Sequence, residues 1–504
     1  MGYIEKQHRD QLTLFPDSLD SYVSSSNPVR VIEAFVNGLR MKELGFIRSN
    51  PAKTGRPGYD PADLLKLFIY GYINRIQSSR SLEKETHRNV ELMWLIGNLK
   101  PNFKTIADFR KENATALKNC CRKFTLMCRE LKVLTSHLVA IDGSVFKASN
   151  NKSKSIHISQ ARETVNAIDA LISRYFEVIS SNDKSEDGYL KAEETDLESK
   201  LEKVNHVAVK VEKALAQLDK KPEKPKNKKK AVDQLKASKE VIEAGIQHLQ
   251  DNKISNLAFT DPDARRFRKG GVTQIGYNTQ IAVEHDSKLI ISHDLTQDLS
   301  DRKQLHEQAK KAMDALGKQS IEVYADKGYH TYDDIANCEK DGIKTYVPEQ
   351  ECSPNSGHNM FTKTQFIYDS ETDRYRCPDD HFLTKVKAKK EKGYDLYTTT
   401  ACADCKLKIN CTIDPKGRRI KRDKREDIVD KGRKRLSENP EAMKLRRCIV
   451  EHPFGVLKQT LNMNQFLTRG ISSVSAEMSL AVLSFNLKRL TNIMGVEKLV
   501  KVMV

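Results

Sequence analysis

The sequence predicts an α/β protein in which buried strands alternate with amphipathic helices. The first observation is the apolar run at 138–141, which predicts a buried strand. The second is a pair of alternating or apolar runs at 276–285 and 288–295, which predicts an antiparallel hairpin. The third is a later alternation of patterns: helix 301–316, strand 321–325, helix 332–342 and strand 344–348.

Taken in chain order, these elements are a strand, a long insertion, two strands, a helix, a strand, a helix and a strand. With the insertion removed, this is the order that opens a ribonuclease-H-like α/β core. We therefore expect the core in three pieces, at 136–154, at 258–348 and, as a C-terminal helical part, at 441–504.

Residues 51–135 predict an all-α domain, which follows an N-terminal segment of mixed composition at 1–50. Pro61 suits the first turn of a helix that Asp60 would cap. The domain carries four arginines that we expect to be exposed: Arg75, Arg80, Arg88 and Arg110. Such a module is suited either to DNA-end binding, with Arg80 and Arg110 as phosphate contacts, or to packing or dimerisation.

Residues 155–257 are charged, poor in aromatic residues and helix-prone. Apolar residues recur there at spacings of three and four, which predicts a coiled-coil seam. The prolines of the lysine-rich stretch 220–230 cannot continue a helix, so we expect a long antiparallel hairpin with this stretch at its tip. An arm for protein contacts and an arm that touches DNA both fit this pattern.

The formal net charge of this 504-residue chain is +18, which indicates a polyanionic partner, most simply nucleic acid. A solvated basic surface is the alternative. No apolar run reaches the roughly 18 residues that a membrane span needs, and nothing resembles a signal peptide. We expect a cytoplasmic protein with no membrane partner.

Asp142 and Asp326 stand in equivalent places, because each ends an apolar strand and is followed by glycine within two residues. The pair Asp142–Gly143 taken alone is also typical of a turn. If the two strands are parallel neighbours, both carboxylates emerge at one edge of the sheet, where their repulsion favours a cation between them. Carboxylate oxygens favour Mg²⁺ (or Mn²⁺), and two such ions can stabilise both the attacking and the leaving oxygen of a phosphodiester.

A third acid is expected from a C-terminal helix, and Glu451 supplies it. Arg447, Glu451 and Lys458 are spaced so that they share one helix face, while Ile449 and neighbouring apolar residues would pack on the sheet. An ordinary amphipathic helix with surface charge is the alternative for this triplet alone. Asp301 is predicted to open a surface helix and to lie outside the site.

Several stretches carry a more specific likeness: "GRPGYDPADLLKLFIYGYINRIQSSRSLE", "TIADFR", "DPDAR", "GYNTQIAVE", "YADKGYH" and "EHPFGVLK". Together with the three acids, they resemble bacterial insertion-sequence transposases of the DDE class, of the group numbered eleven-eighty-two, related to the insertion-sequence four/five superfamily. The set Arg447, Glu451 and Lys458 is similar to the tyrosine-arginine-glutamate-lysine motif of these enzymes. Lys444 replaces the tyrosine, so hairpin formation on the transposon end is not implied.

The resemblance implies a helical N-terminal domain that binds transposon ends and an interrupted catalytic core. It also implies Asp142, Asp326 and Glu451 as the metal-binding triad, with Arg447 and Lys458 in contact with DNA phosphate or supporting the helix. The implied partners are the terminal inverted repeats and target DNA, bound by a homodimer when two ends are paired. Such an enzyme works in the bacterial cytoplasm, at the nucleoid.

Residues 349–440 form an insertion that carries a cysteine cluster. Four thiols at a C-x-x-C pair and two flanking positions suit a tetrahedral zinc site: Cys377, Cys402, Cys405 and Cys411. Buried or free thiols are the alternative. We favour zinc, because the stretch is short of apolar residues that would otherwise hold it together.

The sequence thus predicts a DNA transposase that cleaves phosphodiester bonds at the ends of its element with divalent metal ions and joins them to target DNA. Two alternatives remain at this stage: a catalytically silent DNA-binding protein derived from a transposase, and a ribonuclease-H-like endonuclease without strand transfer.

Overall fold

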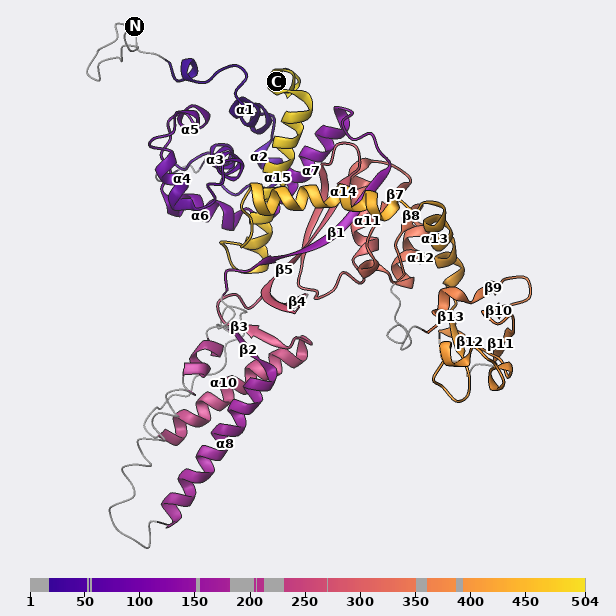
Figure 1. The fold of residues 1–504 in the computed structure, drawn as a ribbon. Coiled ribbons are helices and arrows are strands. Elements are labelled where there is room, and N and C mark those ends of the chain that lie inside the picture. Colours follow the sequence, from indigo (N-terminus) through magenta and orange to yellow (C-terminus); the bar gives the residue numbers. More distant parts are fainter. Residues whose placement is uncertain are drawn as a thin grey trace, which may run out of the picture.

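The computed structural model describes residues 18–51, 54, 57–150, 155–181, 204, 206–212, 231–269, 271–349, 360–386 and 393–503. A mixed sheet lies at the centre, N-terminal helices and the C-terminal helices lie at one end, and a helical arm and a small β-sheet extend from the rest (Figure 1). The predicted α/β class is confirmed.

The central sheet has a mixed order, β4-β5-β1-β7-β8, with β6 also paired to β5. Its strands are β1 (Leu138–Lys147), β4 (Arg265–Lys269), β5 (Val272–Glu284), β6 (Ile290–Thr296), β7 (Ile321–Tyr324) and β8 (Ile343–Tyr346). β5 pairs antiparallel with β1, β4 and β6, whereas β1, β7 and β8 run parallel. The predicted hairpin therefore corresponds to β5 and β6.

β1 continues beyond its neighbour β7. The β1–β7 pairing ends with Ala140 opposite Tyr324, while the pairing of β1 with β5 continues to Lys147. The sequence predicted that Asp142 ends a strand, and this prediction is wrong. Asp142 lies inside β1, at the point where one side of the strand has lost its partner.

One face of β1 is covered by α14 (Ala442–Gly455), which leads into a π-helical turn at Val456–Thr460. The ring of Phe146 on β1 lies 6.2 Å from that of Phe454 on α14. Two further helices, α11 (Leu305–Leu316) and α12 (Tyr332–Lys340), connect β6, β7 and β8 and contact the sheet. No helix among the described residues is long and apolar enough to cross a membrane.

The N-terminal helices share one hydrophobic core with the sheet. They are α1 (Val29–Asn37), α2 (Met41–Leu44), α3 (Pro61–Ile73), α4 (Ser79–Glu85), α5 (Val90–Leu95), α6 (Phe103–Glu112) and α7 (Ala114–Glu130). As predicted, Pro61 opens α3 and Asp60 caps it, accepting a 2.8 Å hydrogen bond from Ala62 N. The C-terminal helix α15 (Ile471–Met494) joins the two parts, since it packs against α3, α6, α7 and β6. α16 (Val496–Met503) then packs on α1.

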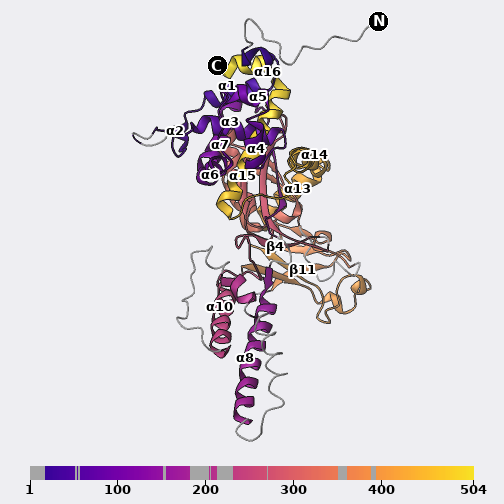
Figure 2. The same cartoon turned by 90° about the vertical axis from the view of Figure 1, so that its left-hand side faces the viewer.

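The arm consists of α8 (Ile158–Ser181) and α10 (Ala231–Asp251), which extend away from the sheet in both views (Figures 1 and 2). At its base, β2 (Ser155–His157) pairs antiparallel with β3 (Asn256–Ala258). The arm has a separate apolar core that includes Ile168 and Ile242, in agreement with the predicted helical seam. The lysine-rich stretch 220–230 lies outside the described residues.

The insertion after β8 contains a small antiparallel sheet, in the order β13-β12-β11-β10-β9. Its strands are β9 (Ile367–Asp369), β10 (Arg374–Arg376), β11 (Phe382–Val386), β12 (Tyr394–Thr398) and β13 (Arg419–Asp423). They enclose a core that includes Tyr375, Leu383 and Tyr397.

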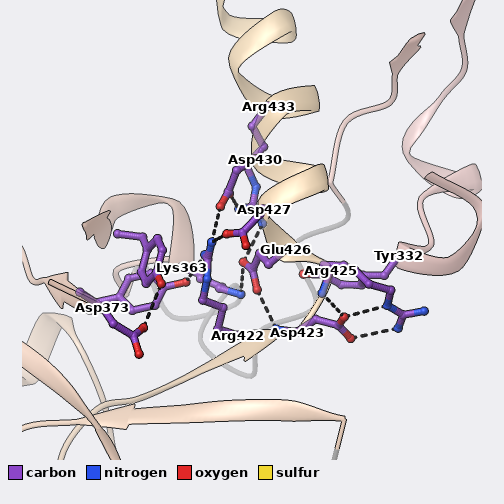
Figure 3. Close-up of polar contacts among 12 residues, drawn as sticks. Tyr332, Lys363, Asp373, Arg422, Asp423, Arg425, Glu426, Asp427, Asp430 and Arg433 are labelled. Atoms are coloured by element: carbon purple, nitrogen blue, oxygen red, sulfur yellow. Dashed lines mark hydrogen bonds and ion pairs between the residues drawn. The ribbon is translucent and has the colours of Figure 1, made fainter. Parts of the chain in front are cut away.

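A polar network joins this small sheet to α13 (Glu426–Glu438) (Figure 3). Glu426 is fully buried and accepts hydrogen bonds from Asp423 N at 3.0 Å and from Arg433 Nη2 at 3.2 Å. Arg422 Nη2 donates to Asp430 at 2.8 Å. Because buried charges are stable only when paired, these ion pairs fix the sheet to the helix that leads back to the core.

Glu477 on α15 ties the C-terminal helix to the loop before it. Its carboxylate is fully buried and accepts hydrogen bonds from Leu467 N at 3.0 Å and from Thr468 N and Oγ1 at 3.0 and 2.7 Å. We expect Glu477→Ala to lower the free energy of unfolding by about 2–4 kcal/mol, because these donors lose their acceptor in a buried setting. Thermal unfolding measures this, with exposed Glu497→Ala as the control; equal melting temperatures would contradict the assignment.

Candidate active site

Two carboxylates lie side by side where β7 ends. Ala140 and Tyr324 are the last residues that pair between β1 and β7. Asp142 and Asp326 each follow one of them by two residues. The strands are parallel neighbours, as predicted, so the two aspartates leave the paired region at the same level. Asp326 Oδ1 accepts a hydrogen bond from Gly328 N at 2.7 Å, which orients this carboxylate at the start of a tight turn.

A buried arginine joins the two aspartates. Arg446 Nη2 lies 2.6 Å from Asp142 Oδ1 and 4.0 Å from Asp326 Oδ2, and the arginine side chain is 10% exposed. Arg446 was not among the residues predicted for the site, which included its neighbour Arg447 instead. A usable signal was present: Arg446, Ile449, Val450 and Pro453 follow the helical repeat, and all four are buried on α14.

A third aspartate, Asp301, belongs to the same neighbourhood. Its Oδ1 accepts hydrogen bonds from Asn278 Nδ2 at 2.8 Å and from Gln280 Nε2 at 2.7 Å, both on β5. A methyl group added to Gly143 would meet this oxygen at 2.4 Å, so Asp301 lies directly beside the residue that follows Asp142. A methyl group added to Gly328 would lie 3.6 Å from the other oxygen of Asp301.

The prediction that Asp301 opens a surface helix outside the site is wrong. Asp301 is half-buried in a bend, and α11 begins only at Leu305. The polar residues of β5 that hold Asp301 were a signal, because a buried central strand rarely carries Asn278 and Gln280 unless something polar pairs with them.

Burial is the main reason why the pKa of Asp142 is raised, to about 6, and the negative charges of Asp326 and Asp301 raise it further, while Arg446 lowers it. Buried Tyr329 donates its hydroxyl proton to Gln280 Oε1, and burial followed by the charge of the same three aspartates raises the pKa of this phenol well above its ordinary value. The site is thus a partly buried cluster of negative charge.

The other C-terminal candidates have different surroundings. Glu451 is exposed on α14, and its carboxylate has no hydrogen bond or ion pair with any other described residue. Arg447 is exposed as well. Lys458, in the π-helical turn, donates from Nζ to Ser144 Oγ at 2.6 Å and lies 4.7 Å from the centre of the Phe146 ring. Lys458 is therefore attached to β1 two residues beyond Asp142.

The residues at this edge of the sheet fit a divalent cation in chemistry but are not yet gathered as a complete ligand set. Carboxylate oxygens are the donors that Mg²⁺ prefers, and a positive group already lies between Asp142 and Asp326. However, no three His, Cys, Asp or Glu side chains in the described part of the chain lie close enough together to hold a metal ion. A third ligand would have to move in.

The two arginines proposed for DNA contact differ. Arg80 is exposed near the start of α4, 5.2 Å from the ring of Phe103. Arg110 was predicted to be exposed, and this is wrong. It is buried, with its guanidinium over the ring of Phe68 at 5.4 Å. The repeat of α6 explains the difference, because Ile106, Phe109 and Arg110 share the buried stripe.

The four candidate zinc ligands lie in one part of the small sheet domain. Burial raises the pKa of Cys411 to about 11; the guanidinium of Arg418 lowers it, and the thiols of Cys402, Cys405 and Cys377 each raise it. Cys405 Sγ donates to Asp379 Oδ2 at 3.3 Å, two residues along the chain from Cys377, and a methyl group added to Gly417 would meet Cys402 Sγ at 3.1 Å. Cys377 Sγ accepts a 3.3 Å hydrogen bond from the backbone N–H of His381.

Two family matches agree with this architecture. Residues 17–112 match a family described as "Transposase domain (DUF772)", and residues 376–491 match one described as "Transposase DDE domain". The first covers most of the N-terminal helices, and the second covers the cysteine cluster, α14 and most of α15. No curated protein and no solved structure matches the chain.

The chain thus carries the domains of a DNA transposase. The two matches together indicate an insertion-sequence DDE transposase, as the sequence analysis predicted.

The raised pKa of Asp142 predicts a pH dependence. A carboxyl group whose pKa is higher in the folded chain stabilises the fold fully below the unfolded value, near 3.8, and loses this contribution as the pH rises through about 6. In EDTA, the melting temperature of Asp142→Asn relative to wild type should therefore increase between about pH 4.5 and pH 7.5. A constant difference in melting temperature between the two proteins across this pH range would show that the ionisation of Asp142 is not linked to folding.

Proposed function

We propose that this transposase binds the ends of its insertion sequence, cleaves the phosphodiester bonds there and joins the freed ends to target DNA. The observation that carries the proposal is the pairing of Asp142 and Asp326 across the parallel strands β1 and β7, beside a buried cation. The DDE transposase match supports the reaction class.

The proposed core is ribonuclease-H-like. The strand order β6-β5-β1-β7-β8 supports this, with the first two pairings antiparallel and the last two parallel. The arm enters between β1 and β4, and the small sheet domain lies between β8 and α14, so both behave as insertions in such a core.

Asp142, Asp326 and Glu451 would hold Mg²⁺ or Mn²⁺, which when bound would polarise the phosphodiester and activate the attacking hydroxyl or water. Glu451 would approach the aspartates by a movement of α14 or its side chain. Lys458 would hold the strand that carries Asp142, through Ser144, and Arg447 would face DNA phosphate from the exposed side of α14.

DNA-end binding is assigned to the N-terminal helices, with exposed Arg80 as a phosphate contact. Arg110 supports the fold there instead of touching DNA, because it is buried. The net charge of +18 supports a DNA partner of this kind. Paired ends would be held by two copies of the chain, and the work would take place at the nucleoid in the bacterial cytoplasm.

The endonuclease alternative would use the same acids without strand transfer, and incubation with terminal repeats, target DNA and Mg²⁺ separates the two by the sizes of cut and joined products. A silent DNA-binding descendant would bind ends without cutting. The presence of all three acids favours an active enzyme over this last alternative.

Asp142→Asn, Asp326→Asn and Glu451→Gln should each lower cleavage by orders of magnitude, because a metal-held charge contributes several kcal/mol to stabilising the transition state. Binding of DNA ends should survive, since it depends on phosphate contacts elsewhere. Cleavage and gel-shift assays on the same DNA measure both.

Asp314→Asn is the matched control for these variants, because Asp314 is exposed near the end of α11, before β7 begins, whereas Asp326 follows the end of β7. If Glu451→Gln cleaved transposon ends as fast as this control, Glu451 would not be the third ligand.

We also propose that Cys377, Cys402, Cys405 and Cys411 bind a structural zinc ion. The gathering of the four thiols in a small domain supports this, as does the backbone N–H that donates to Cys377 Sγ. The ligands are not close enough in this arrangement to hold the ion, so binding would draw the turns together.

Metal analysis of the purified chain should find about one zinc ion, and the double variant Cys402→Ser/Cys405→Ser should lose it and melt at a lower temperature. Cys448→Ser is the control, because this exposed cysteine lies on α14 outside the cluster. Zinc well below one ion per chain in the wild type would refute the site.

A further inference from the structure

Arg446 occupies an unusual position among the charged residues of α14. Its side chain is 10% exposed, and the two aspartates at the sheet edge are its ion-pair partners. Its Nε is buried and has no hydrogen-bond partner within the described parts of the chain. The guanidinium is therefore held mainly by the charges of Asp142 and Asp326 and not by a network of its own.

The position of the guanidinium conflicts with that of a metal ion. A divalent cation bound by Asp142 and Asp326 would lie about 2.0–2.6 Å from their oxygens. Arg446 Nη2 already lies 2.6 Å from Asp142 Oδ1. The guanidinium and the ion would both lie against the carboxylates of Asp142 and Asp326, and two positive groups so close repel each other, so the guanidinium in this position opposes binding of the ion.

We infer that Arg446 is an internal counter-ion that competes with the divalent cation for Asp142 and Asp326. This inference rests on the proposed metal-dependent function. In the metal-free chain, Arg446 neutralises two neighbouring carboxylates that would otherwise repel each other. When the cation binds, the guanidinium leaves Asp142, and the ligands become free to close around the ion.

The competition also explains the spread of the acids. A planar guanidinium is a larger group than a metal ion, and it holds Asp142 at 2.6 Å and Asp326 at 4.0 Å without drawing a third carboxylate inward. Exchange for a small, doubly charged ion would shorten these distances and attract further carboxylates, with Asp301 in the bend before α11 and Glu451 on α14 as the candidates.

Arg447 provides a matched control. It has the same charge, lies on the same helix and differs by one position in the sequence, but it is exposed and turned away from the buried stripe. Any effect of net charge on metal affinity would appear in both variants, whereas competition for the aspartates would appear only at Arg446.

The test is Mn²⁺ binding to the full chain without DNA, measured by titration calorimetry and by the electron paramagnetic resonance signal of free Mn²⁺. We expect Arg446→Met to bind Mn²⁺ at least about fivefold more tightly than wild type, and Arg447→Met to bind it as wild type does. In EDTA, Arg446→Met should also melt at a lower temperature than Arg447→Met, and added Mn²⁺ should reduce this difference, because the ion replaces the lost positive charge.

If Arg446→Met does not fold, Arg446→Lys replaces it in the same Mn²⁺ binding test. It keeps the charge but not the planar guanidinium, and its Mn²⁺ affinity should lie between those of wild type and Arg446→Met. Unchanged or weaker Mn²⁺ binding in the Arg446 variant that folds would overturn the inference.

Asp142→Asn separates failure of the inference from failure of the proposed function. If Asp142→Asn weakens Mn²⁺ binding but the Arg446 variants do not tighten it, only the competition is refuted. If Asp142→Asn leaves Mn²⁺ binding unchanged, or the wild type binds no Mn²⁺, the aspartates are not the metal site, and both the inference and the proposed metal centre are wrong.

Discussion

The repulsion between Asp142 and Asp326 is the constraint on which the rest of the site depends. The parallel pairing of β1 and β7 brings both residues to the same level, and the burial of Asp142 reduces the screening of its charge by water. Such a pair is stable only beside a cation. The fold supplies Arg446 from α14, so the docking of that helix on β1 is electrostatic as well as apolar.

The helix α14 is therefore divided between two tasks. Its buried stripe, with Arg446, Ile449 and Val450, attaches it to the sheet, and its exposed side carries Arg447 and Glu451. The π-helical turn that follows widens the helix and brings Lys458 to Ser144 on β1. The same helix thus presents Arg446 to the two aspartates from its buried side and keeps the carboxylate of Glu451 exposed.

The order of the strands along the chain could be predicted, because apolar runs are local patterns, but Asp142 lies inside β1 and not at its end. The neighbours of Asp142 and Asp326 could not be predicted. Asp301 reaches the site from a bend before α11 and is held by Asn278 and Gln280 on a strand far from it in sequence, so only the pairing of β5 with β1 brings them together. Arg110 was predicted to be exposed and Arg446 was missed for a related reason. A helical pattern shows which residues share a face, but a charged residue is usually expected on the exposed face. Each of these arginines is buried because of a partner from another element, Phe68 for Arg110 and Asp142 for Arg446, which a local pattern does not show.

α15 is central to the architecture, because it packs against β6 and against the N-terminal helices α1, α3, α6 and α7 within a single core. Cys121 on α7 donates from Sγ to Ser479 O at 3.2 Å, and Asn486 Nδ2 donates to Ile290 O at 2.8 Å, so α15 is bonded to both sides. α15, β6, β5 and β1 therefore form a continuous series of packed and paired elements between the N-terminal helices and the acids.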